Sequence, residues 1–524
     1  MKKLSLYLFL VLGLLYCNIG FTSNETTVLE DKDPNNELFR PTVNEIKSFL
    51  EKKEELWYGV YMSDVKIGWF QFKTGAYPSS KSKNNSVYEI MQNFNLTMTV
   101  EGNNETQYTS RSTIEMKHIF ETTQPFNLLH YEEKTLDENK IFTKLGEKKE
   151  KNFEVTYNNN GIITKKILNN LSESLYDHFS LDAWILKKER TKEENFKYKE
   201  FDFEILDYLT FNVKINDIVN TKVNGIDYSY YKINMDQIGS NIEFMKISAE
   251  YLIDKKGNYL NFYLNDVFEF RLESEENAKN LDESFGVFVE TGIDISSPLP
   301  DEIFSKEIQT IIYEVIGDAK SIYEGKSQKL EKLSNGNMLL IVGYDQKGDL
   351  VPQLEKVTQK QVEFYMRYTP QYPHTSTIIS ELLKRAIKNE KDDIEKIIKL
   401  TNFVSEYVED DYESNSISVF DVIETKKGDC TEHAQLFTVL ARAAGFPTRE
   451  VGGWAYDGKN RFIPHAWTEV AIKLDDDYYW VPADPTWDMI IPVVHIKSNA
   501  ESILGKFSLI LKEINFANGE KIQY

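Results

Sequence analysis

The amino-acid sequence predicts an α+β protein, in which a large antiparallel β-rich region precedes a smaller mixed region. Residues 55–295 alternate apolar and polar side chains between short polar turns, which is typical of strands with one buried face. After Pro373 the apolar spacing changes to that of amphipathic helices. A helix that begins at Cys430 is then followed directly by strands, which indicates a helix packed on a sheet.

Residues 1–23 have the pattern of a cleavable signal peptide. Two lysines precede an apolar run over residues 4–16, which is short for a bilayer span but suits a signal sequence. Polar residues follow, and we expect cleavage between Gly20 and Ser23. The mature protein is therefore predicted to be exported to the periplasm or the extracellular space, with no integral membrane span.

The chain contains two cysteines, Cys17 and Cys430. Removal of the signal peptide would leave Cys430 as the only thiol, so no internal disulfide could form. In an alternative interpretation, Cys17 is the lipid-anchor site of a bacterial lipoprotein. Tyr16 argues against this alternative, because such sites prefer a small residue at that position.

The formal net charge is −22. An acidic chain is poorly suited to bind nucleic acid or an anionic membrane through its overall field. We therefore expect no nucleic-acid partner.

Hairpin patterns recur through the N-terminal region. Residues 57–72 form two strand-like segments around a polar turn, and residues 249–264 do so around a Lys-Lys-Gly-Asn turn. Residues 90–100 alternate with period two. These patterns predict an antiparallel β domain over 55–295, without a recognisable catalytic group.

A Ser-Ser-Pro-Leu-Pro stretch at 296–300 is typical of a linker. Two strand-like segments follow, at 308–315 and 338–342. We therefore predict a small β-rich connector over 296–373 and a separate α+β domain over 374–524.

This last domain opens with two predicted helices. Ile378, Leu382 and Ala386 repeat at four-residue spacing, and Asp392 is placed to cap a second helix over 394–408. These helices would pack beside the segment that follows.

The helix that begins at Cys430 has clear start and stop signals. Asp429 and Glu432 form an Asp-x-x-Glu capping box, Gly445 ends the helix and Pro447 prevents its continuation. The unpaired N–H groups and positive dipole at this end favour a thiolate and could stabilise an oxyanion. The alternative is a buried, inert cysteine.

Three strands are predicted after this helix, over 448–456, 464–473 and 478–484. The last two would form a hairpin around an acidic run, which we interpret as a solvated turn rather than a cation site. A turn centred between residues 474 and 475 would place His465 directly opposite Asp484. The carboxylate could then hold the imidazole in one tautomer and orientation.

Five ordered motifs carry a resemblance to a known family. They are Gly428–Ala434, Arg442–Arg449, Val451–Trp454, His465–Val470 and Trp480–Thr486. At these motifs, over roughly residues 375–490, the chain resembles the transglutaminase-like superfamily. The resemblance implies a papain-like α+β core with the cysteine helix on an antiparallel sheet. It also implies a catalytic triad of Cys430 as nucleophile, His465 as base and acid, and Asp484 as orienting carboxylate.

The resemblance implies a cysteine-dependent amide hydrolase or acyltransferase, and the signal-like N-terminus implies that it is exported. The thiolate would attack a peptide or glutamine carboxamide carbonyl, and water or a primary amine would resolve the thioester. The expected substrate is a protein or peptide, with no cofactor and no metal. Trp454 and Trp467 are candidate substrate-binding residues along the acyl groove, with core packing as the alternative.

A non-catalytic binding or scaffold protein with a degenerate core is the alternative from another class. The complete set of Cys430, His465 and Asp484 argues against it, since a degenerate core has no chemical need for all three. The sequence leaves open whether water or an amine is the acceptor.

Overall fold

The computed structural model divides the chain into two compact units, each described separately below. The first comprises Met1–Ser240 and Ile247–Val289, and the second comprises Glu290–Tyr524 with residues 241–246. The predicted signal peptide and Cys17 lie outside the described residues. The structure describes residues 38–524 except for 63, 81, 83–84, 102–106, 138–139, 160, 170, 172, 204–205, 224–225, 239–246, 266, 282–291, 301–302, 304–306, 345–353, 412–417, 475 and 500–506.

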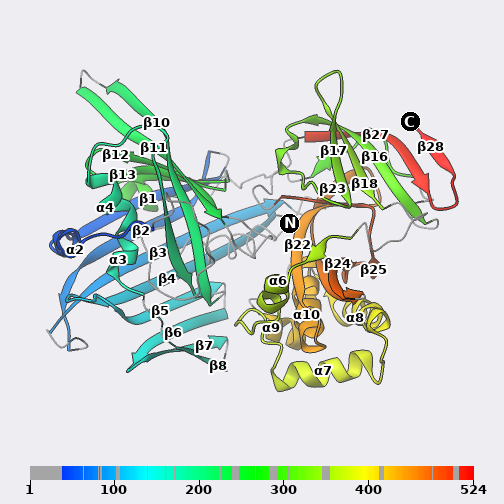
Figure 1. The fold of residues 1–524 in the computed structure, drawn as a ribbon, viewed down its shortest axis with the longest axis horizontal. Helices are drawn as coiled ribbons and strands as arrows, with labels where there is room; N and C mark the ends of the chain where they lie inside the picture. Colours follow the sequence, from blue (N-terminus) through cyan, green and yellow to red (C-terminus); the bar gives the residue numbers. More distant parts are fainter. Residues whose placement is uncertain are drawn as a thin grey trace. The chain divides into compact units, whose positions relative to one another are not determined.

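The first unit is built on a 14-stranded antiparallel sheet (Figure 1). Its order is β8-β7-β6-β5-β4-β3-β2-β1-β14-β13-β12-β11-β10-β9, so that pairing of β1 with β14 joins two meanders. The predicted antiparallel β-rich region is confirmed. The strands are β1 (Glu54–Met62), β2 (Val65–Pro78), β3 (Ser86–Glu101), β4 (Gln107–Glu121), β5 (Leu128–Asp137), β6 (Lys140–Lys149), β7 (Asn152–Asn159), β8 (Ile162–Asn169), β9 (Asn195–Asp202), β10 (Asp207–Val223), β11 (Ile226–Ile238), β12 (Ser248–Asp254), β13 (Tyr259–Leu264) and β14 (Phe268–Glu273).

Short helices pack against this sheet. They are α2 (Val43–Leu50), α3 (Leu175–His178), α4 (Ser180–Leu186) and α5 (Glu275–Lys279). Phe49 of α2 stacks on Phe179 at 4.5 Å between ring centroids, and Phe179 contacts Tyr88 of β3 at 5.8 Å. These aromatic contacts hold α2 and the junction of α3 with α4 against the sheet.

A seven-stranded sheet forms the centre of the second unit. Its main path is β19-β24-β23-β22-β26, with β15 paired to β23 and β25 paired to β24. The three central strands occupy the stretch where the sequence predicts them. The strands are β15 (Ile293–Asp294), β19 (Lys356–Val357), β22 (Thr448–Tyr456), β23 (Arg461–Leu474), β24 (Asp477–Asp484), β25 (Met489–Ile490) and β26 (His495–Lys497).

Helices cover part of one face of this sheet (Figure 1). Leu436, Phe437 and Leu440 of α10 share a buried core with Val470 of β23 and Ala483 of β24. A two-stranded pairing of β20 (Glu409–Asp410) with β21 (Lys427–Gly428) leads into α10. The helices are α6 (Gln359–Tyr365), α7 (Thr377–Ile387), α8 (Asp393–Tyr407), α9 (Val419–Thr425) and α10 (Cys430–Ala443).

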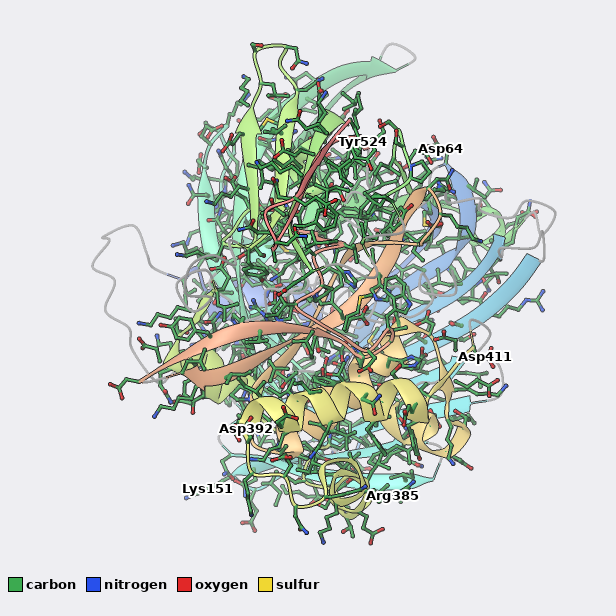
Figure 2. All side chains as sticks on the ribbon, turned by 90° about the vertical axis from the view of Figure 1, so that its right-hand side faces the viewer. Asp64, Lys151, Arg385, Asp392, Asp411 and Tyr524 are labelled. Carbon is green, nitrogen blue, oxygen red and sulfur yellow. The ribbon has the colours of Figure 1, made fainter. Side chains whose placement is uncertain are left out.

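The caps of these helices follow the local sequence. Asp392 accepts a hydrogen bond from the backbone N–H of Glu395 at 3.0 Å, and it lies at the start of α8 in Figure 2. Gly445 adopts a φ of +98° after α10, a conformation that glycine tolerates best. A helix packed on an antiparallel sheet confirms the predicted α+β class.

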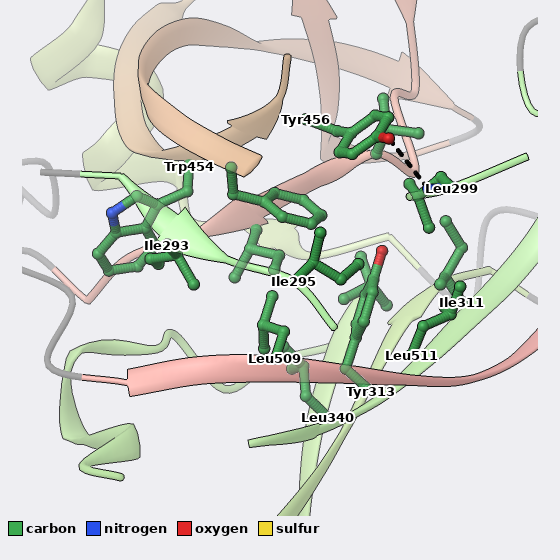
Figure 3. Close-up of a cluster of buried hydrophobic side chains, with 14 of the residues drawn as sticks. Ile293, Ile295, Leu299, Ile311, Tyr313, Leu340, Trp454, Tyr456, Leu509 and Leu511 are labelled. Carbon is green, nitrogen blue, oxygen red and sulfur yellow. Dashed lines mark hydrogen bonds between the residues drawn. The ribbon is translucent and has the colours of Figure 1, made fainter. Parts of the chain in front are cut away.

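A five-stranded sheet with order β17-β18-β16-β27-β28 completes the second unit. It packs on the seven-stranded sheet through a buried apolar cluster that includes Trp454, Tyr313 and Leu509 (Figure 3). In this sheet, a strand of the predicted connector pairs with a strand near the C-terminal end of the chain, which the sequence did not indicate. The predicted domain ranges remain predictions. The strands are β16 (Ile308–Gly317), β17 (Gln328–Lys332), β18 (Met338–Gly343), β27 (Phe507–Phe516) and β28 (Lys521–Gln523), and the 3-10 helix η2 (Ala319–Ser321) follows β16.

Within the described residues, none of the helices combines the length and the apolar composition needed to cross a bilayer.

Candidate active site

Cys430 is the first residue of α10, as the capping signals predict. Asp429 accepts from the backbone N–H of Thr431 at 2.7 Å, and Glu432 accepts from the N–H of Asp429 at 2.7 Å. Gly428 leaves room for this fold, because a Cβ there would lie 2.3 Å from Cβ of Glu432. The cap therefore occupies the Thr431 N–H, one of the donors that the sequence suggested for an oxyanion.

The carboxyl groups of Asp429 and Glu432 in this cap influence the electrostatic environment of the Cys430 thiol. Burial, followed by the charge of Asp429, raises the pKa of Glu432 well above its usual value. A raised pKa favours the uncharged form of Glu432 over its carboxylate. Negative charge on a carboxyl of this cap would offset part of the helix dipole's effect on Cys430.

The sulfur of Cys430 accepts a hydrogen bond from the backbone N–H of Ala466, 3.2 Å away. Ala466 follows His465 in β23, so this contact holds the sulfur beside the backbone of the predicted base. A donor directed at sulfur favours the thiolate over the thiol. Cys430 is only 3% exposed, in a small apolar cluster with Ala434 and Ala466.

His465 and Asp484 are hydrogen-bonded, but their strands pair in a different register from the one predicted. Leu474 pairs with Asp477 and Thr468 with Ala483, so the turn is centred near residue 475.5. Direct cross-strand pairing of His465 with Asp484 was therefore wrong by two residues, because the acidic turn forms further along the chain. Continuing this register, Asp484 lies diagonally from His465 on the same face, and Nε2 of His465 donates to Oδ2 at 2.8 Å.

Asp484 is fully buried and accepts three hydrogen bonds. Oδ2 accepts from Nε2 of His465 and from Nε2 of His495, both at 2.8 Å, and Oδ1 accepts from the N–H of Thr486 at 2.9 Å. Burial alone would raise the pKa of Asp484. The charge and hydrogen bond of His465 and the hydrogen bond of His495 outweigh burial and hold that pKa below its usual range.

Two aromatic residues flank the His465 ring. Trp487 stacks on it with 4.3 Å between ring centroids, and Trp467 lies 6.2 Å away at a small interplanar angle. Trp454 points elsewhere: it packs in the apolar cluster of Figure 3, with its ring 5.3 Å from that of Phe507. Of the two predicted substrate-binding tryptophans, only Trp467 is brought to His465.

Sequence reasoning missed His495 and Trp487. His495 lies in β26, which pairs with β22 through Gly453, Trp454 and Ala455. Trp487 is close to Asp484 in the sequence, and this position could have indicated that it lies near the candidate site. No local pattern marks His495, since it reaches Asp484 only because β26 pairs on the far side of β22.

Gly453 allows the close approach of β26. A Cβ at this position would lie 2.1 Å from the backbone carbonyl oxygen of Ile496. Any larger residue would therefore displace the strand that carries His495.

A buried ion-pair network lies further along the same strands. Glu469 contacts Arg449 at 2.6 Å and Lys497 at 2.9 Å. Burial opposes ionisation of Glu469, but attraction to Lys497 and Arg449 prevails and lowers its pKa to about 2. Because Lys497 is in β26 and Glu469 in β23, the network ties together the strands that carry His495 and His465.

His465, Asp484 and His495 are also a possible metal-ligand set, with one ligand atom each within 4.8 Å of the others. Both imidazole Nε2 atoms donate to the carboxylate in this arrangement. A metal ion bound at roughly 2.0–2.2 Å would have to replace both protons. The donors fit a hydrogen-bonded acid-base group without such an exchange.

A family model matches the part of the chain that contains this candidate site. Residues 380–485 match the family model of the Transglutaminase-like superfamily, as the five motifs indicated. That segment contains Cys430, His465 and Asp484, and it is a transglutaminase-like core. No curated protein matches the chain.

Three solved structures are similar in part. A candidate cysteine protease from Cytophaga hutchinsonii is 15% identical, over 42% of this chain and 84% of that one, with a TM-score of 0.25. A β-barrel-like protein of a domain of unknown function from Brucella abortus is 9% identical, over 43% and 96%, with a TM-score of 0.31. A TGase is 16% identical, over 30% and 44%, with a TM-score of 0.17.

Proposed function

We propose that the C-terminal unit is a cysteine-dependent amide hydrolase or acyltransferase that forms a thioester intermediate. Cys430 is the nucleophile, His465 the general base and acid, and Asp484 the carboxylate that orients His465. Trp467 and Trp487 flank the reacting imidazole, and Trp467 is a proposed wall of the acyl site. The surroundings of Trp454 favour a packing role instead.

Two contacts support this proposal, one at the Cys430 sulfur and one between His465 and Asp484. The N–H of Ala466 holds the Cys430 sulfur beside His465, and Nε2 of His465 donates to buried Asp484. An ionised carboxylate only accepts hydrogen bonds, so Nε2 carries the proton of the neutral ring. Nδ1 is then the nitrogen that exchanges a proton with the thiol.

The reaction proceeds in two halves. The Cys430 thiolate attacks the carbonyl carbon of a peptide or glutamine carboxamide, the C–N bond breaks, and His465 gives its proton to the departing amine or ammonia. Water or a primary amine then attacks the thioester and gives a proton to His465, and the thiolate leaves. Asp484 stabilises the imidazolium during both halves.

We also propose that the protein is exported, from the signal-like residues 1–23. Its substrate would then be a protein or peptide of the periplasm or the extracellular space. Cell fractionation with N-terminal sequencing of the mature protein tests this. A start near Gly20 to Ser23 supports cleavage, a lipidated Cys17 would support an anchor, and an intact N-terminus in the cytoplasm would refute export.

The function itself is tested with a glutamine-containing peptide, with and without a primary amine, using the wild type and a Cys430→Ser control. Ammonia release alone indicates hydrolysis of the side-chain amide, and an amine adduct indicates transfer. Cleaved backbone indicates a peptidase. In each case the Cys430→Ser variant should lose the product.

A product that persists in Cys430→Ser would refute the thioester mechanism. An inert wild type, with Cys430 no more reactive than a free thiol, would favour the non-catalytic scaffold interpretation.

A further inference from the structure

Asp484 is shared by two histidines. Nε2 of His465 and Nε2 of His495 both lie 2.8 Å from the same oxygen, Oδ2, and all three side chains are at most 2% exposed. Since the carboxylate is an acceptor only, both Nε2 atoms carry hydrogen. The two imidazole rings are 5.2 Å apart and nearly perpendicular.

We propose that His495 is a positioning residue, which fixes the Asp484 carboxylate and limits how strongly it stabilises the His465 imidazolium. This inference deepens the proposed function and rests on it. His495 acts through Asp484 and does not itself touch the reacting sulfur or carbonyl.

The contacts of His495 support this role. Trp467 lies edge-to-face with its ring at 5.0 Å, and Trp487 does so at 5.5 Å, so two indoles hold the imidazole plane. Nδ1 of His495 is buried and has no hydrogen-bond partner among the described residues. The polar role of this side chain is therefore its Nε2–H donated to Asp484.

Sharing one oxygen has an electrostatic consequence. Each N–H donor disperses the negative charge of Oδ2, so the bond from His495 weakens the attraction between Asp484 and a protonated His465. Loss of the His495 donor should leave the imidazolium more stable and the carboxylate less firmly oriented. The first effect raises the pH at which His465 loses its proton, and the second lowers turnover.

The other charged groups on these strands are the same in the wild type and in variants of His495. Glu469 pairs with both Arg449 and Lys497, and the three side chains together carry one net positive charge. Among the described residues, Asp484 and His465 are titratable groups in direct contact with His495. A shift between variants therefore reports the His495 donor.

The test is the pH dependence of Cys430 alkylation by iodoacetamide in the full chain, measured by mass spectrometry of the Cys430 peptide. A thiolate-imidazolium pair gives two steps, and the upper step reports loss of the His465 proton. We compare wild type with His495→Gln, whose amide reaches the Nε2 position, and with His495→Asn, whose amide falls short. His495→Leu, with no donor, is a further variant.

The upper step should move to higher pH by at least about 0.5 unit in His495→Asn and His495→Leu, and stay in place in His495→Gln. Turnover of the glutamine peptide should fall roughly tenfold in the two variants that lose the donor and recover in His495→Gln. If all variants keep the wild-type upper step, or lose activity equally without a shift, the positioning role is refuted.

A failure of the proposed function gives a different pattern. In that case wild-type Cys430 shows a single step near the free-thiol value of about 8.5. That outcome contradicts both proposals, whereas two steps unaffected by the His495 variants contradict the positioning role alone.

Discussion

Replacement of Glu469 by Gln should loosen the sheet that carries the candidate site. Glu469 is buried, and its carboxylate pairs with Arg449 and Lys497 at 2.6 and 2.9 Å. The amide keeps the size of the side chain but removes its charge. Arg449 in β22 and Lys497 in β26 would then lose the attraction of this carboxylate.

The magnitude follows from the pKa of Glu469. A fall from 4.5 to about 2 corresponds to roughly 3 kcal/mol of stability. Removal of one partner of a buried pair typically costs about 3–5 kcal/mol, so we expect a loss in that range at pH 7. Because the folded pKa is depressed, this stability is present above pH 4.5 and is lost as pH falls toward 2. The difference between wild type and variant should shrink over that window.

Hydrogen-exchange mass spectrometry under mild denaturant is the appropriate assay, since it reports the second unit separately from the first. Peptides that cover β22 to β26 should lose protection in Glu469→Gln. The matched control is Asp477→Asn, which removes an exposed pair with Lys356 and should cost less than about 1 kcal/mol. Equal protection in Glu469→Gln and Asp477→Asn at pH 7 would refute the reasoning.

Three further predictions concern the residues around Cys430 and Asp484. Asp484→Asn should lower peptide turnover by about 10³- to 10⁴-fold, because the amide disturbs the tautomer of His465; retention of half the activity would contradict this. Glu432→Gln should cost less thermal stability than Glu432→Ala, because the Gln amide oxygen can still accept from the N–H of Asp429 and burial already disfavours the charged form of Glu432. Glu432→Ala should lose about 0.5–2 kcal/mol by calorimetry, and equal losses in the two variants would contradict this. Gly453→Ala should reduce exchange protection of β26, because its Cβ would meet Ile496, and unchanged protection would refute that clash.

The parts of the fold that depend on residues close together in the sequence could be predicted from it. Asp429 caps α10, Gly445 follows its end with positive φ, and β22 spans Thr448 to Tyr456. Capping, helix termination and strand alternation are decided within a few residues. The cysteine helix and the strands that follow it are therefore predictable from local sequence alone.

Long-range pairing could not be predicted in the same way. β27 pairs with β16 although nearly two hundred residues separate them, and periodicity carries no information about a strand's partner. The two-residue register error at His465 and Asp484 arose because the exact position of a turn depends on its backbone geometry. His495 was missed for both reasons, since its role depends on which strand β26 joins and in what register.

The central claim is that Cys430 and His465 form a reactive pair, and one measurement tests it most directly. At pH 6 a free thiol with a pKa of about 8.5 is roughly 0.3% ionised, whereas a thiolate-imidazolium pair is largely ionised. Iodoacetamide should therefore label Cys430 of the wild type at least about tenfold faster than Cys430 of His465→Gln at pH 6. Equal labelling rates in the two proteins, both folded by hydrogen exchange, would contradict the claim.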